Sequence, residues 1–185
     1  MAPRVLVALL LAVAILGCIP AQRSAAVQDD AFRLEIETAS PRYESGSAVV
    51  VTARLTYVGP EPTVHAFGSG SGPVLFGLTQ LDGPFDPGGS GTADCARYEF
   101  RRGEPQTVAY RKGGGWSADD PMADAYVAFF DDPRVRLPNG VFQFTARIEL
   151  SIGDCRPPVA FHRLEAAIRV VMGGQVGPLE ATPGA

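Results

Sequence analysis

The sequence predicts an all-β fold, namely an antiparallel immunoglobulin-like β-sandwich of seven or eight strands with one short helix in a connection. Segments that alternate apolar and polar residues, or that are rich in β-branched residues, recur at intervals of about ten to fifteen residues. Glycine and proline, 21 and 16 of the 185 residues, indicate many turns. No strand-like segment alternates with long helical patterns, which disfavours a parallel α/β sheet and leaves a closed barrel as the alternative.

Four strands are expected in the first half of the chain. Residues 32–37 alternate apolar and charged side chains without exception, which is typical of a strand with one face on a core and one face in water. Residues 49–57 form a longer, β-branched run that suits the centre of a sheet. Shorter strands are expected at residues 63–67 and 74–81, and residues 84–92 are interpreted as a long surface loop.

The second half of the chain continues the strand pattern and adds the helix. Further strands are expected at residues 95–100, 107–112, 141–150 and 164–172. One segment departs from this pattern, because Asp119 and Asp120 precede Pro121 in the manner of a helix start. The following residues favour a helix over 122–130, which Pro133 would end.

The first 26 residues are interpreted as a signal peptide. Arg4 supplies a positive charge, and residues 5–17 contain no polar side chain. The run Ile15-Leu16-Gly17-Cys18 resembles a bacterial lipobox, in which Cys18 would be acylated and become the first residue of the mature chain. Processing at this site would make the protein an extracytoplasmic, membrane-anchored lipoprotein.

Two other fates of the amino terminus stay open. Ser24-Ala25-Ala26 is a small-x-small cleavage site that would release a soluble chain beginning at Val27. An uncleaved anchor is disfavoured, because Pro20 and Arg23 end the apolar run short of the roughly 20 residues that span a bilayer. Lipidation at Cys18 is favoured over both.

The cysteines fit an exported protein. Beyond Cys18, the chain contains only Cys95 and Cys155, an even number that predicts a disulfide in an oxidising compartment. Two buried free thiols are the alternative. Neither cysteine has a CxxC partner, so cysteine catalysis and metal binding are disfavoured.

Charge and length limit the domain organisation and the partners. A linker is expected at residues 27–31, one domain at 32–172 and a flexible tail at 173–185. Residues 27–185 carry 14 basic and 20 acidic side chains, which argues against nucleic acid or anionic lipid as a partner. Contact with the membrane is therefore expected only through the amino-terminal lipid.

Four short motifs resemble the intracellular proteinase inhibitor (BsuPI-type) domain family. In chain order they are Tyr43-x-x-Gly46-x-x-Val49-x-Val51, the run from Phe76 to Asp82-Gly83, Phe100-Arg101-Arg102-Gly103-Glu104, and Leu137-Pro138-Asn139-Gly140-Val141-Phe142. Their order covers most of residues 32–150 and implies an immunoglobulin-like fold. The resemblance also implies proteinase inhibition as an alternative function, although the chain adds an export signal, two cysteines and an acidic insert at 119–132.

No catalytic site, cofactor or metal site is predicted. His65 and His162 each stand alone in strand-like surroundings, and no G-x-S-x-G elbow or phosphate-binding loop occurs. Two sets of loop carboxylates could offer oxygen ligands to calcium, but their spacing matches no known calcium loop. These sets are Asp82, Asp86 and Asp94, and Asp119, Asp120 and Asp124.

Aromatic residues on loops are the best candidates for partner binding. Trp116, the only tryptophan, follows three glycines and lies near Tyr110, and Phe85 belongs to the loop at 84–92. The alternative is that Trp116 folds back and caps the end of the sandwich. The sequence thus predicts a non-catalytic binding or accessory module of the bacterial cell envelope with a protein partner.

Overall fold

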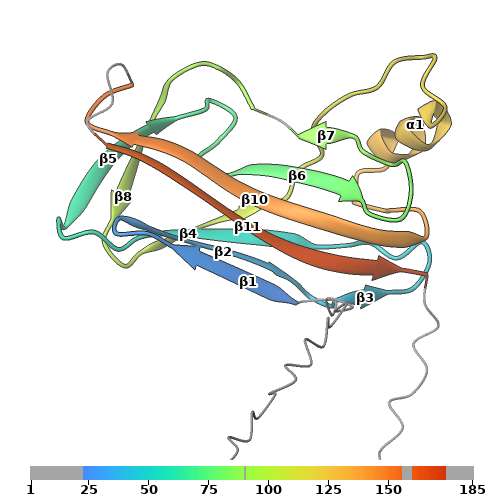
Figure 1. The fold of residues 1–185 in the computed structure, drawn as a ribbon, viewed down its shortest axis with the longest axis horizontal. Helices are drawn as coiled ribbons and strands as arrows, with labels where there is room; N and C mark the ends of the chain where they lie inside the picture. The colour runs from blue at the N-terminus through green and yellow to red at the C-terminus, as the bar shows by residue number, and fades with distance from the viewer. Residues whose placement is uncertain (1–22, 90, 156–159, 174–185) are drawn as a thin grey trace, which may run out of the picture.

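A computed structural model describes residues 23–89, 91–155 and 160–173 and contains two β-sheets and one helix (Figure 1). The all-β class is therefore confirmed. The first sheet is antiparallel and follows the order β1-β2-β4-β9. Its strands are β1 (Ser24–Gln28), β2 (Phe32–Thr38), β4 (Val51–Tyr57) and β9 (Pro105–Ala109).

The second sheet is built on a long hairpin. In this hairpin, β10 (Gly140–Ile152) and β11 (Ala160–Met172) pair over all 13 residues of each strand. The two-residue strand β3 (Arg42–Tyr43) pairs in parallel with the end of β11. The remaining strands are β5 (Thr63–Gly68), β6 (Leu75–Gln80), β7 (Gly88–Gly89) and β8 (Ala96–Arg101).

The second sheet forks along the other edge of β10. The first part of this edge, Phe142 to Arg147, pairs with β6, whereas Ser151 and Ile152 pair with β5. In the described part of the chain, residues 148–150 pair with neither of these strands. β7 extends the β6 branch and β8 extends the β5 branch, so the two branches diverge from one strand (Figure 1).

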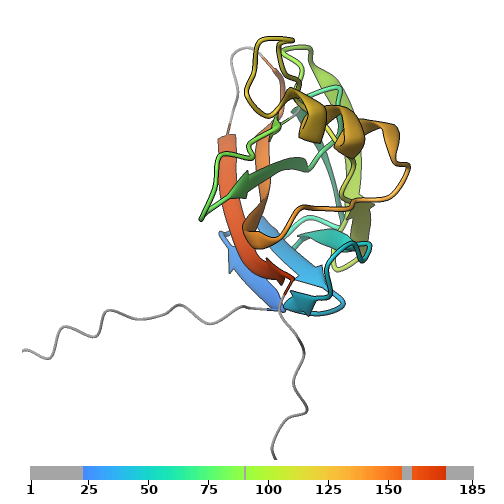
Figure 2. The same ribbon diagram turned by 90° about the vertical axis from the view of Figure 1, so that its right-hand side faces the viewer.

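The core lies between the two sheets. It is formed by every second side chain of the strands, because successive side chains of a strand point to opposite faces. Alternate residues of β10 from Phe142 to Leu150 are buried, and so are alternate residues of β2 and β4. The intervening residues of β10, including Arg147 and Glu149, lie on the outer face of the second sheet. Figure 2 shows β1 and β2 on one side of the domain and the helix on the other.

The domain begins earlier than the sequence analysis predicted. Residues 27–31 were expected to be a linker, but Val27 and Gln28 belong to β1, which pairs in register with β2 from Ser24↔Glu37 to Gln28↔Arg33. Ala25 and Val27 pack against the core. β1 was not predicted because its side chains are mostly small and give a weak strand pattern. Its pairing depends mainly on backbone hydrogen bonds to β2.

The short strands β3 and β7 were also not predicted, and the strand count exceeds the expected seven or eight among the described residues. In β7, Gly89 lies so close to β6 that a Cβ atom would be 2.9 Å from the carbonyl oxygen of Phe76. Only glycine permits this approach. Residues 84–92 are therefore not a plain surface loop, because part of the segment joins the second sheet.

The predicted helix is present as α1 (Ala123–Asp131). The helix starts later than expected, because the N-cap residue is Met122 and it makes no side-chain cap hydrogen bond. Asp120 accepts the Met122 N–H at 2.8 Å in the turn before the helix. Tyr126 and Phe129 are the buried residues of α1 and face the second sheet through Phe85.

The predicted disulfide is also present. Cys95, just before β8, is bonded to Cys155, just after β10, with their Cα atoms 6.3 Å apart. The bond joins the segment between β7 and β8 to the end of the β10–β11 hairpin. It therefore links the start of β8, in the β5 branch, to the end of β10 through a closed loop of 60 residues.

Replacing both cysteines, as Cys95→Ser with Cys155→Ser, is expected to lower the free energy of unfolding by about 4 kcal/mol, because the loop no longer restricts the unfolded chain. Urea unfolding of the oxidised protein and of the double variant measures the difference. Reduction of the native protein should reproduce the loss, and an unfolding free energy that is unchanged in both cases would contradict the prediction.

Candidate functional site

Two of the three predicted partner-binding aromatics belong to the core. Phe85 is fully buried, and its ring lies 4.9 Å from that of Tyr126 and 5.3 Å from that of Phe129. The prediction that Phe85 is exposed on a loop is wrong, because the apolar face of α1 needs a large side chain between it and the second sheet. Phe85 is the side chain of that loop that fills this position.

Tyr110 is also buried, between Phe76 and Phe144 at ring distances of 5.6 and 5.1 Å. Burial raises the pKa of its hydroxyl well above the ordinary value. The residue follows β9, and its backbone N–H donates to the carbonyl of Val51 in β4. Tyr110 therefore continues the inward-facing pattern and cannot act as an exposed anchor for a partner.

Trp116 is the one exposed member of the predicted set, with 40% of its surface accessible. Its ring stacks on Phe130 of α1 at 5.1 Å, with 16° between the ring planes. The side chain thus folds back on the domain, as the alternative interpretation expected, but it covers the helix instead of the end of the sheets. Phe85, Tyr110 and Trp116 do not form a common surface.

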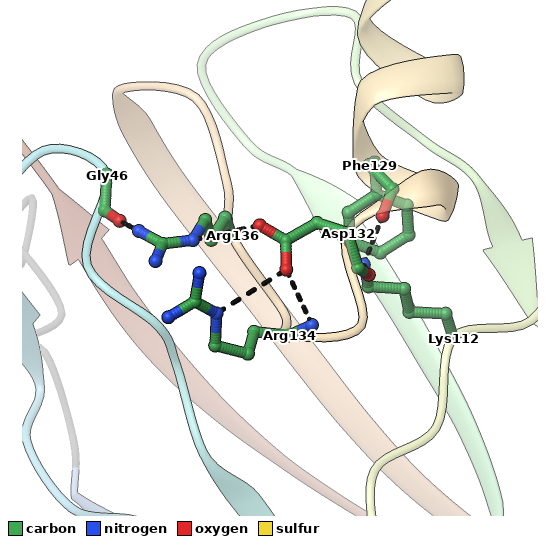
Figure 3. Close-up of polar contacts among 6 residues, drawn as sticks. All are labelled: Gly46, Lys112, Phe129, Asp132, Arg134 and Arg136. Atoms are coloured by element: carbon green, nitrogen blue, oxygen red, sulfur yellow. Dashed lines mark hydrogen bonds and ion pairs between the residues drawn. The ribbon is translucent and has the colours of Figure 1, made fainter.

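A cluster of polar contacts fixes the carboxyl end of α1 (Figure 3). Lys112 donates to the carbonyl oxygens of Phe129 and Asp132, as suits a cation at a helix carboxyl end. The Asp132 carboxylate accepts the Arg134 N–H at 2.8 Å and pairs with the Arg136 guanidinium at 2.9 Å. The Arg134 N–H lowers the pKa of Asp132, and Arg136 reaches the carbonyl of Gly46. This cluster holds a loop against the helix and leaves no carboxylate free for chemistry.

The two proposed sets of calcium-binding carboxylates do not converge among the described residues. Two members instead bind the backbone of segments distant in the sequence: Asp82 accepts the Val141 N–H at 2.9 Å, and Asp94 accepts the Gly70 N–H at 3.0 Å. Hydrogen bonds lower the pKa of both carboxyl groups, mainly from the Val141 N–H at Asp82 and from the Thr92 side chain, followed by the Gly70 N–H, at Asp94.

A different group brings Asp29, Asp30 and His162 together, with potential ligand atoms within 4.8 Å of one another. His162 Nδ1 lies 2.8 Å from Asp29 Oδ2, which is a hydrogen-bond distance. Tetrahedral zinc with bonds of about 2.0–2.1 Å would hold two such ligands about 3.3 Å apart. The pair is therefore a hydrogen bond that ties the turn between β1 and β2 to the start of β11, and it does not have the geometry of a zinc site.

Asp29 is the centre of this contact. Its Oδ1 accepts the backbone N–H groups of Ala31 and Phe32 at 2.9 and 2.7 Å. Burial raises the pKa of Asp29, but the hydrogen bonds from Phe32, His162 and Ala31 outweigh burial and leave the pKa below its ordinary value of 3.8. His65, the other histidine, lies on the exposed side of β5, 3.3 Å from Glu99.

A cleft of about 670 Å³ lies in the fork of the second sheet. Phe67 of β5 forms one wall, and the segment 91–95 with the Cys95–Cys155 disulfide forms another. The floor is the outer face of β10 and β11, including Arg147, Glu149 and Phe161. A smaller cavity of about 380 Å³ continues along β6 and shares Arg147 with the cleft.

Arg147 and Glu149 lie in the strand expected at residues 141–150, but the cleft itself was not predicted. The cleft combines side chains from residue 67 to residue 161, and the segment that forms one wall had been interpreted as surface loop. Phe161 precedes the strand expected at 164–172, so its outward position in β11 was not predicted either. Cys18, the predicted lipidation site, lies outside the described residues.

No protein-family model matches this sequence, and no curated protein matches it. Two crystal structures of a β-glucosidase from Listeria innocua, one of them in complex with glucose, align with 76% of the chain at identities of 13% and 14%. The TM-score is 0.34 in both cases, and the chain spans 16% of the length of that enzyme. At this TM-score the likeness carries no argument about fold or function.

Within the described part of the chain, no helix has both the length and the apolar character that crossing a bilayer requires.

Replacing Asp29 with asparagine is expected to lower the free energy of unfolding by about 2 kcal/mol at neutral pH, because charge-assisted hydrogen bonds are lost. A lowered pKa in the folded state stabilises the fold above the unfolded pKa of about 3.9, and this contribution disappears as the pH falls through the folded pKa. The difference between the native protein and Asp29→Asn should therefore shrink as the pH falls below the unfolded pKa of about 3.9.

Urea unfolding of both proteins across this pH range provides the measurement. Asp30→Asn is the matched control, because the neighbouring carboxylate is almost fully exposed and lies 3.8 Å from His162. An equal loss from Asp30→Asn, or a loss from Asp29→Asn that persists in acid, would refute the role given to Asp29.

Proposed function

We propose that this chain is an exported, lipid-anchored, non-catalytic immunoglobulin-like module that binds or supports other components of the bacterial cell envelope. The observation that carries the proposal is the position of β1 relative to the two cleavage sites. Cleavage after Ala26 would remove three of the five residues of β1 and would break its register with β2. Processing before Cys18 would keep the whole strand in the mature chain.

The spacing between Cys18 and β1 also suits a surface tether. Residues 19–23 separate the two, and five extended residues span at most about 18 Å. A lipid on Cys18 would therefore hold the first sheet near the membrane surface. β1 begins at the end of the domain where β11 finishes, so this end of the domain would face the bilayer (Figure 1).

The Cys95–Cys155 disulfide supports an extracytoplasmic location. Cys95 is exposed and Cys155 is half-buried, so both would be accessible to the reducing thiols of a cytoplasm. A disulfide between accessible cysteines persists where the environment is oxidising. The two segments that this bond joins are part of the folded domain.

An immunoglobulin-like topology is supported by two mainly antiparallel sheets that share one core of alternating residues. The absence of catalysis is a proposal that rests on the geometry of the titratable groups. The His162–Asp29 pair and the Asp132 cluster are both engaged in contacts that hold turns and the helix. Neither group has a nucleophile among its hydrogen-bond partners in the described residues.

Proteinase inhibition is the alternative function, and its support is the motif resemblance alone. Titration of the purified protein against several serine proteinases and metalloproteinases separates the two functions. We expect no loss of proteinase activity at equimolar protein. Stoichiometric inhibition of any of these enzymes would establish the inhibitor function and overturn the accessory one.

Mass spectrometry of the intact protein tests the anchor. The expected product begins at Cys18, carries acyl chains and fractionates with the membrane, because processing there preserves β1. Cys18→Ser should abolish acylation, whereas the double variant of Cys95 and Cys155 should retain it. A soluble chain that begins at Val27 would contradict the proposed anchor.

A further inference from the structure

The floor of the cleft in the second sheet has hydrogen-bonding groups that the protein does not use. Arg147 Nε lies 3.4 Å from Glu149 Oε1, and Arg163 Nε lies 3.7 Å from the same oxygen. These are ion pairs without hydrogen-bond geometry. Arg147 Nε itself is buried and has no hydrogen-bond partner among the described residues, whereas 40% of the Arg147 side chain and 37% of the Glu149 side chain are exposed. The exposed parts of the Arg147 guanidinium and of the Glu149 carboxylate therefore offer donors and acceptors to another molecule.

Aromatic side chains lie beside these polar groups. Phe161 is in the outward register of β11 and is 58% exposed, although it lies at the edge of a formed cleft. Phe67 of β5 lines the same cleft and is half-buried. An exposed phenylalanine beside unused polar groups suits a ligand that has both an apolar face and hydrogen-bonding edges.

The charges around the cleft restrict the ligand further. Among the described residues that line the cleft, Arg147 is the one basic side chain, against Asp94, Glu149 and Asp154, and Arg163 pairs with Glu149 from beside the cleft. An anionic ligand would meet a net negative surface. Hydroxyl groups, in contrast, can accept from Arg147 and donate to carboxylates at the same time.

We propose that this cleft binds a neutral carbohydrate chain, with sugar rings against Phe161 and hydroxyl groups on Arg147 and Glu149. The cleft has a volume of about 670 Å³, and the cavity of about 380 Å³ next to it would take a further sugar unit. Both fall in the range of about 300–1,000 Å³ that is usual for small-molecule sites. Because the rings of a chain repeat, the continuous pair of cavities favours an oligosaccharide over a single sugar.

This inference deepens the proposed function, since it names the class of envelope component that the module would bind. Phe161 is near the start of β11, whereas the proposed tether enters at the end of the domain where β11 finishes. The cleft would consequently be presented away from the lipid. Its binding does not depend on acylation of Cys18, so the two proposals fail separately.

Isothermal titration calorimetry of the processed protein, purified from cells that express the full chain, tests the inference. The neutral probes are hexamers of β-1,4-linked N-acetylglucosamine and of β-1,4-linked glucose, at up to about 10 mM. Hexagalacturonate serves as the anionic probe and hexalysine as the cationic probe. We expect at least one neutral hexamer to bind more tightly than either charged probe.

Two variants and two matched controls locate the binding. Phe161→Ala and Arg147→Gln should each weaken binding of the neutral hexamer by about tenfold or more. Trp116→Ala removes another exposed aromatic, and Arg33→Gln removes another arginine that is paired with a glutamate two residues later, at 2.9 Å. Both controls should bind as the native protein does, and circular dichroism confirms that all four variants fold.

Three results would overturn the inference. The first is no binding of either neutral hexamer, and the second is tighter binding of hexalysine or hexagalacturonate. The third is loss of binding in Trp116→Ala that equals the loss in Phe161→Ala, because that result would move the site to α1. A lipidated protein that gives any of these results would retain the proposed anchor and lose the carbohydrate site.

Discussion

The pairing of β10 on both of its edges is the constraint on which the rest of the structure depends. One edge is hydrogen-bonded to β11 over 13 residue pairs, and the other edge is divided between β6 and β5. Since side chains alternate along a strand, this register sends Phe144 and Ile148 into the core and Arg147 and Glu149 to the outer face. A slip by one residue would exchange these faces, so the buried aromatic side chains and the charged floor of the cleft are fixed together.

The fork of the second sheet converts this register into a concave surface. A continuous partner along β10 would give a flat outer face, but β5 and β6 leave residues 148–150 without a partner on this edge in the described chain. The Cys95–Cys155 disulfide then holds the connecting segment beside the hairpin end. The wall of the cleft therefore depends on a covalent bond.

The strands with strong alternation could be predicted from the sequence, and those that depend on backbone contacts could not. β2, β4 and β10 have one apolar face and one polar face, which the period of two reveals. β1 and β7 contain small residues whose pairing is decided by their neighbours. Phe85 was assigned to a surface loop because its local sequence is rich in glycine and proline, whereas its burial depends on α1, some 40 residues away. The disulfide was predictable from cysteine number alone, but the cleft that it closes required the three-dimensional fold.

Hydrogen–deuterium exchange of the oxidised protein, with and without the hexamer of β-1,4-linked N-acetylglucosamine, locates the ligand most directly. Slower exchange is expected in residues 91–95, in the second half of β10 and at the start of β11, because these segments surround the cleft. Slower exchange confined to residues 111–131, around Trp116 and α1, would contradict a binding site in the fork of the second sheet.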